Sequence, residues 1–180
     1  VRALELLSTL SDKDLRDMPM EILEDNMSTP TDQLSPRVEN EMILKPFKHF
    51  FAKAFSKEAQ TFRNNPALLV NWIQKNIKMN PDKHAMRIPQ TPISVWECRV
   101  ADERSRDIFF VDVARSIGID ARKDAVTGKI QYKKGGNWMD VDFDTTVQQV
   151  AKTGTLILNY TPTEYLDDPK YYTHFTISKI

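Results

Sequence analysis

The stretch RDIFFVDVARSIGIDAR, residues 106–122, decides the fold class of this 180-residue chain. Its apolar residues recur every three or four positions, which is the spacing of a helix buried along one face; they are Ile108, Phe109, Val113, Ala114 and Ile117. Asp102 is placed to cap the start of this helix, and Gly118 is placed to end it. The sequence therefore predicts a buried helix that is followed by a strand opening with Ala121 and Arg122.

Three strands are predicted after this helix. They cover residues 121–126, 129–133 and 138–144, and turn residues stand between them at Thr127-Gly128 and Gly135-Gly136-Asn137. Strands joined by turns this short pair in antiparallel fashion. The central helix is therefore expected to pack on an antiparallel sheet.

The chain before residue 80 carries mainly helix signals. Ser35-Pro36 has the cap-plus-proline pattern of a helix start and leads into residues 38–44. Phenylalanines recur at helical spacing over residues 47–55, and Asn65-Pro66 starts a further apolar stripe. We expect several helices here, separated from the central helix by a proline-containing loop.

These patterns predict an α+β fold in three consecutive parts. Residues 1–90 form a helical N-terminal part, and residues 91–150 form the core of central helix and antiparallel sheet. Residues 151–180 are expected to form a β tail, which could begin a following β-sandwich domain.

Composition narrows the classes of partner. Lysine plus arginine and aspartate plus glutamate both number 25, so net charge gives no reason to expect a nucleic acid partner. No run approaches the roughly 18 apolar residues of a membrane span. Cys98 is the one cysteine, which excludes an internal disulfide and a cysteine-based zinc site. No motif calls for a cofactor or a metal.

Two motifs of this chain resemble transglutaminase-like domains, which have a cysteine-protease-like fold. Residues 115–122 follow the family's R-x-x-G-I-P-A-R turn, with Asp120 in place of the proline, and Trp138 to Asp142 follow its W-x-x-x-D ending. In that family a cysteine opens the helix, and a histidine and an aspartate follow on the next strands. The resemblance implies a thiol-dependent site for acyl transfer or peptide hydrolysis.

The resemblance also implies that most of this catalytic triad is replaced. It places Glu103 at the vacated nucleophile position and Asp142 at the remnant acid position. The histidine would fall within residues 126–129, where there is none. A carboxylate suits a helix N-terminus but cannot replace a thiol in acyl transfer. We therefore expect an inactive, pseudoenzyme-like cleft, lined by Asp102, Glu103, Arg104, Trp138, Asp140 and Asp142.

Two other interpretations of this region remain open. Cys98 could serve as an alternative nucleophile, with His84 or His174 as its base, although a small buried thiol is the ordinary state of a lone cysteine. The alternating Asp140, Asp142 and Asp144 could bind calcium, but the glycine of a calcium-binding loop is missing. A solvated or arginine-paired carboxylate face is the preferred interpretation.

Further stretches resemble the transglutaminase-like regions of large exported bacterial proteins, namely residues 92–96, 99–102, 127–129 and 169–175. This resemblance implies a periplasmic or cell-surface location. The leading hypothesis is an inactive domain that binds a peptide or glycan, or that positions neighbouring domains of the same polypeptide. The alternatives are an active thiol peptidase or acyltransferase using Cys98, and a structural spacer. A glycan would need an aromatic platform, for which the candidates are Trp96, Tyr132, Trp138, Tyr160, Tyr165, Tyr171 and Tyr172.

Overall fold

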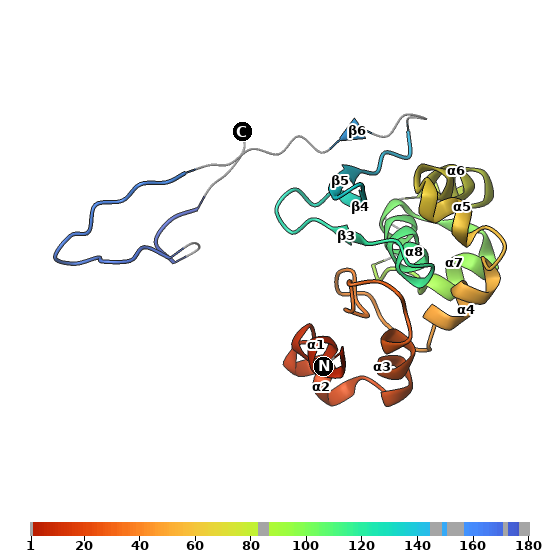
Figure 1. The fold of residues 1–180 in the computed structure, drawn as a ribbon, viewed down its shortest axis with the longest axis horizontal. Coiled ribbons are helices and arrows are strands. Elements are labelled where there is room, and N and C mark those ends of the chain that lie inside the picture. The colour runs from red at the N-terminus through yellow and green to blue at the C-terminus, as the bar shows by residue number, and fades with distance from the viewer. Residues whose placement is uncertain (1, 83–86, 145–148, 151–156, 171–172, 177–180) are drawn as a thin grey trace.

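The structure, a computed structural model, describes residues 2–82, 87–144, 149–150, 157–170 and 173–176. It combines helices with a β-sheet, as the α+β prediction requires (Figure 1). In chain order the elements are α1 (Arg2–Ser8), α2 (Asp12–Asp17), α3 (Met20–Met27), α4 (Lys48–Ala54), α5 (Ala59–Asn64), α6 (Ala67–Asn76), β1 (Lys78–Met79), α7 (Pro92–Cys98), β2 (Val100–Ala101), α8 (Glu103–Ser116), β3 (Ala121–Lys123), β4 (Ile130–Lys134), β5 (Asn137–Asp140) and β6 (Gln149–Val150).

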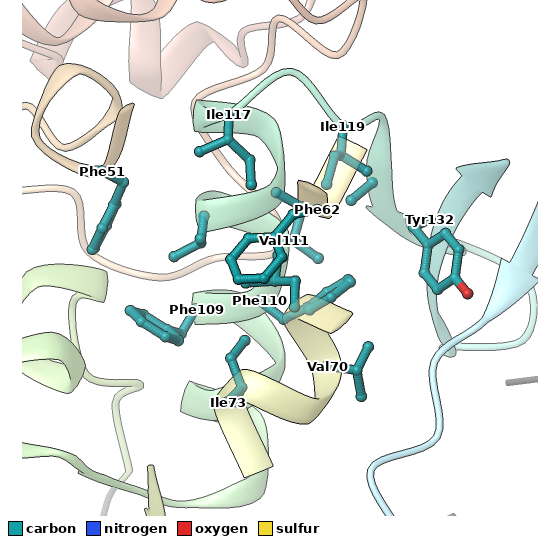
Figure 2. Packing of buried hydrophobic residues seen from close by; sticks show 14 of the residues in the cluster. Phe51, Phe62, Val70, Ile73, Phe109, Phe110, Val111, Ile117, Ile119 and Tyr132 are labelled. Carbon is teal, nitrogen blue, oxygen red and sulfur yellow. The ribbon is translucent and has the colours of Figure 1, made fainter. Parts of the chain in front are cut away.

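Helix α8 is the centre of the molecule, and other elements lie on several sides of it. Residues of α4, α6 and the sheet converge on it, including Phe51, Val70 and Tyr132 (Figure 2). The expected apolar positions of α8 are all buried, and so are Phe110 and Val111 between them. The helix is therefore covered on more than one face, which explains why its apolar residues are not confined to a single stripe.

The turn after α8 explains the motif of residues 115–122. Gly118 has a φ of +84°, a left-handed conformation that glycine adopts without strain, and the amide of Ile119 reaches back to the carbonyl of Ala114 at 2.9 Å. A Cβ on Gly118 would lie 2.9 Å from Pro30. The buried guanidinium of Arg115 donates to the carbonyl of Ala121, the first residue of β3, at 2.9 Å. Glycine and arginine thus fix the direction in which the chain leaves the helix.

The main sheet has the strand order β3-β4-β5-β6, and every neighbouring pair is antiparallel. In the register, Ala121 lies opposite Tyr132, which in turn lies opposite Met139. Ala121 and Tyr132 are buried against α8, whereas the strand ends turn toward solvent. A separate two-stranded parallel ladder joins β1 to β2.

Helices α4, α6 and α7 build an aromatic layer on one side of α8. Phe51 of α4 meets the rings of Trp96 and Phe109 at centroid distances of 6.0 and 5.5 Å, both edge to face. Trp72 and Trp96 stack at 5.7 Å, and the guanidinium of Arg99 lies 3.8 Å from the Trp96 ring centroid. The predicted helices over the phenylalanine stripe and after Asn65-Pro66 are therefore confirmed as α4 and α6.

The predicted helix over residues 38–44 is wrong, because this segment is a loop. The Glu41 carboxylate accepts hydrogen bonds from the amides of Val38 and Glu39 at 2.7 and 2.8 Å. The carbonyls of Ser35 and Arg37 are occupied by the Arg115 guanidinium, each at 3.0 Å. Side chains thus bind backbone groups that a helix would need for itself.

Helices α1 to α3 form a small second cluster around Leu6, Leu23 and Leu34. Asp25 of α3 ties this cluster to α4, because its carboxylate accepts from the amides of Phe47, Lys48 and His49 at 2.8, 2.7 and 2.9 Å. These amides have no carbonyl partner within their own helix, so Asp25 acts as an N-terminal cap from another element.

The C-terminal segment lies away from the helices and the sheet (Figure 1). Among its described residues, Thr163 and Leu166 form an isolated antiparallel bridge, and Tyr160 donates to the carbonyl of Leu166 at 2.8 Å. Ile157 and Leu158, within the expected β tail of residues 151–180, belong to no strand, and part of that tail lies outside the described residues. In the described part of the chain, none of the helices has the length and apolar character needed to cross a bilayer.

Candidate binding cleft

A cavity of about 380 Å³ opens between the first turns of α8 and the end of β5. It lies where the sequence predicted a cleft, between the helix that begins at Glu103 and the segment that carries Asp142. The residues that line it are mainly charged; they are Glu103, Arg106, Asp107, Gly128, Lys129, Ile130, Asp140, Val141, Asp142, Phe143 and Asp144.

The helix side of the cleft carries Glu103, Arg106 and Asp107 within the first turn and a half of α8. Arg106 is held in place, since it pairs with Asp107 at 3.1 Å and its guanidinium lies 4.0 Å from the Phe143 ring centroid. Burial raises the pKa of Asp107 to about 6. The positive charge of Arg106 lowers this pKa, and the negative charges of Glu103 and Asp102 raise it further. This helix end thus combines a fixed cation with partly buried carboxyl groups.

The sheet side is organised by Asp140, the last residue of β5. Its carboxylate accepts from the ammonium of Lys129 at 2.6 Å and from the amide of Gln131 at 2.9 Å, and these two bonds hold the pKa of Asp140 below its usual value although burial opposes them. Asp142 follows in a loop and accepts from the backbone amide of Asp144 at 2.8 Å. Asp140, Asp142 and Asp144 all line the cleft, although only Asp140 lies in a strand.

The structure brings together three of the expected lining residues, namely Glu103, Asp140 and Asp142. Asp102 is instead the N-cap of α8, where its carboxylate accepts from the amide of Ser105 at 2.7 Å. Arg104 pairs with Glu39 at 2.7 Å. Trp138 has the Arg122 guanidinium 4.1 Å from its ring centroid. These other three residues have roles outside the lining of the cleft.

Lys129 is the cleft residue that sequence reasoning passed over. It stands at the end of the segment in which the resemblance places a histidine, residues 126–129, and it lines the cavity together with Glu103 and Asp142. The pairing of Lys129 opposite the carboxylate of Asp140 follows from the register of β4 and β5, in which Gln131 lies beside Asp140. That register is set by the turn between the strands, so the spacing of residues in the sequence was not enough to predict it.

The described residues contain no group of three or more histidine, cysteine, aspartate or glutamate side chains placed to hold a metal ion. Of the three aspartates within residues 140–144, Asp140 pairs with Lys129 at 2.6 Å and Asp142 accepts from the backbone amide of Asp144 at 2.8 Å. The observed ion pair is therefore with a lysine, whereas the sequence suggested an arginine or solvent.

Cys98 is exposed, so the expectation of a buried thiol is wrong. It is the last residue of α7, where the negative end of the helix dipole does not favour a thiolate. His174 lies in the C-terminal segment, away from α7, and its Nδ1 accepts from the backbone amide of Lys170 at 2.8 Å (Figure 1). His84 is outside the described residues. Of the two histidines considered as a base, the structure therefore describes only His174, and it brings neither this residue nor a helix N-terminus to the thiol.

Iodoacetamide is expected to alkylate Cys98 in the native protein without denaturant, because the thiol is exposed. Mass spectrometry of samples quenched over time measures the labelling rate, and the Cys98→Ser variant provides the unlabelled baseline. Labelling of Cys98 that begins only after denaturation would contradict this expectation.

The aromatic residues do not form a common platform in the described part of the chain. Trp96 belongs to the aromatic layer, Tyr132 is buried in the core, and Trp138 is covered by Arg122. Tyr160 and Tyr165 lie exposed in the C-terminal segment, and Tyr171 and Tyr172 are outside the described residues. Within the cleft, Phe143 is the aromatic residue, and Arg106 occupies one face of its ring.

Comparisons with known proteins give no relative: no protein-family model, no curated protein and no solved structure matches the chain. The chemistry of the cleft is therefore the observation from which a function has to be argued.

Proposed function

We propose that the chain is a transglutaminase-like domain whose catalytic cleft has become a binding site for a peptide with cationic side chains. The observation that carries this proposal is the lining of the cleft between α8 and β5. It holds the carboxyl groups of Glu103, Asp107, Asp140, Asp142 and Asp144, against the two cations Arg106 and Lys129. The negative excess favours a positively charged ligand group.

The site is proposed as a non-catalytic one because its polar groups lack a nucleophile. Glu103 opens α8, and the hydroxyl nearest to it in sequence, that of Ser105, is buried and accepts from the amide of Gln90 at 2.9 Å. Acyl transfer needs a thiol or hydroxyl beside a base. The one thiol of the chain, that of Cys98, ends a different helix and does not line this cavity.

A peptide suits the cleft better than a glycan does. Sugar rings are usually bound by stacking on an exposed aromatic face, whereas the ring of Phe143 already carries Arg106 at 4.0 Å. A lysine or arginine side chain can instead approach the carboxylates of Glu103 and Asp142 from the open side of the cavity. Neighbouring domains of the same polypeptide, or a separate protein, could supply such a side chain.

Binding of a probe peptide tests the proposal. The blocked peptide acetyl-Ala-Lys-Ala-Lys-Ala-amide is expected to bind, and its glutamate counterpart is not. The Glu103→Gln and Asp142→Asn substitutions should each weaken binding about tenfold, or roughly 1.4 kcal/mol. Isothermal titration calorimetry at low ionic strength measures the affinity, and added salt should lower it because the groups are partly exposed.

Glu24→Gln is the matched control for this experiment. Glu24 is an exposed glutamate of α3, far along the chain from the cleft lining, so its replacement removes one negative charge without changing the cavity. An equal loss of affinity in Glu24→Gln and Glu103→Gln would show that only net charge matters. Equal binding of the lysine and glutamate peptides would overturn the proposal.

A domain-positioning role is the second candidate, and the ion pairs within the cleft favour it. Arg106 pairs with Asp107, and Lys129 pairs with Asp140, so part of the charge is already satisfied within the chain. Each pair lies on one side of the cleft, and the contact of the Arg106 guanidinium with the Phe143 ring is the one that would hold α8 against the segment after β5. The absence of peptide binding, together with a lower thermal stability of Lys129→Met, would favour this candidate.

A further inference from the structure

Five charged side chains gather where α4 lies against α8, inside the molecule and away from the lining of the cleft. Lys48 comes from α4, Asp112 and Arg115 from α8, Asp25 from α3 and Glu41 from the loop before α4. Lys48, Asp112 and Glu41 are each 1% exposed, and Arg115 is 5% exposed. Charged groups this deeply buried need specific partners.

Three of the five have their partners in the backbone. Asp25 accepts from three amides at the start of α4, and Glu41 accepts from two amides of its own loop. Arg115 donates to three carbonyls, those of Ser35, Arg37 and Ala121. Each of these charges is therefore stabilised by hydrogen bonds that do not involve the other two residues of the group.

Lys48 and Asp112 are the two that remain. Within the part of the chain that the structure describes, Lys48 Nζ and both Asp112 oxygens are buried without a hydrogen-bond partner. The Lys48 ammonium lies 5.1 Å from the centroid of the Phe47 ring, which is itself buried. Of the charged groups around Lys48, Asp112 acts on it most strongly, and Lys48 is likewise the strongest charged influence on Asp112.

We propose that near neutral pH the carboxyl group of Asp112 carries a proton while Lys48 is a free amine, so that neither of these buried groups is charged. The proton leaves the ammonium nitrogen and binds a carboxylate oxygen, so a cation and an anion become an amine and a carboxylic acid. Net charge is unchanged by this transfer. The contact between α4 and α8 then contains no charge that lacks a hydrogen bond.

Electrostatics around the pair support this assignment. Burial lowers the pKa of Lys48 to about 7 and raises that of Asp112 to about 8, so burial shifts both groups toward their neutral forms. The positive charge of Arg115 opposes protonation of Lys48, and the negative charge of Glu41 opposes ionisation of Asp112. The negative charges of Asp25 and Glu41 raise the pKa of Lys48, but burial lowers this pKa by more.

Infrared spectroscopy of the whole chain at pH 7.5 tests the proposal. A protonated carboxylic acid has a carbonyl stretching band that a carboxylate lacks. We expect this band in the unmodified protein, and we expect Asp112→Asn to lose it. Asp124→Asn is the matched control, because Asp124 is bound by Thr127 at the surface and its pKa is lowered by those hydrogen bonds, so the band should persist.

The stability of Asp112→Asn provides an independent readout. An amide closely resembles the neutral acid, so this variant should fold and melt within about 3 °C of the unmodified protein at pH 7.5. A permanent ion pair predicts instead that the variant leaves the Lys48 ammonium buried without its counter-charge and melts much earlier. Failure of Asp112→Asn to fold, or absence of the band in the unmodified protein, would overturn the proposal.

Discussion

Phe51→Ala is expected to lower the free energy of unfolding by about 3–5 kcal/mol, because it removes a fully buried ring from the contact between α4 and α8. The ring meets Phe47, Trp96 and Phe109 at centroid distances of 6.4, 6.0 and 5.5 Å. No small movement of one helix can refill the space, since three elements contribute to it. Urea denaturation followed by tryptophan fluorescence and by circular dichroism measures the loss.

Phe50→Ala is the matched control on the same helix. Phe50 is 41% exposed although it also touches Phe51 and Trp96, at 5.1 and 6.1 Å between ring centroids. Its removal should cost about 1 kcal/mol, as less apolar surface is lost and solvent fills the space. Similar losses for the two variants would contradict the placement of the core at Phe51.

Spacing in the sequence was enough to predict the central helix and its two ends. Asp102 caps α8, Gly118 has a positive φ, and the apolar residues between them are buried. The antiparallel strands after it were predicted because short turns leave few alternative pairings. The ends of these strands were predicted less accurately, since β5 stops at Asp140 instead of reaching residue 144.

Long-range side-chain contacts explain what the sequence could not show. The helix expected over residues 38–44 is absent because Glu41 and Arg115 bind the backbone there, and Arg115 lies about 75 positions further along the chain. Helix α7 was not predicted, because the sequence before the central helix was expected to be a proline-containing loop, whereas Pro92 is the first residue of a helix whose cap is Thr91. Lys48 reads as an ordinary surface lysine in sequence, and its burial follows only from the packing of α4 on α8.

The sequence could suggest only some of the residues that line the cavity. The start of α8 at Glu103 and the segment of Asp142, which a family resemblance suggested as the two sides of a cleft, both line this cavity. Which neighbours share it depends on side-chain direction: Arg104 turns to Glu39, whereas Arg106, two residues later, turns to Phe143. Positions two apart on a helix point to different sides, so adjacency in sequence was a poor guide.

Arg115→Met is expected to cost about 3–5 kcal/mol, since each hydrogen bond to a charged group contributes roughly 1.5–3 kcal/mol and the losses overlap. The side chain joins three separate segments through the carbonyls of Ser35, Arg37 and Ala121. Methionine fills much of the volume but removes the donors that join these three segments. Arg115→Lys should recover only part of the loss, because one ammonium cannot reproduce the planar fork of a guanidinium.

Arg122→Met separates this structural role from a simple loss of positive charge. The Arg122 side chain is 37% exposed and pairs with Asp124 at 3.3 Å on the sheet surface, so its loss should cost less than about 1 kcal/mol. Hydrogen exchange supplies the second measurement. Arg115→Met should expose the amides of β3 and of residues 35–41 together, because one side chain holds both segments on α8. Equal stability of the Arg115 and Arg122 variants, or faster exchange in only one of those segments, would show that Arg115 is not the residue that joins the helix turn to the sheet.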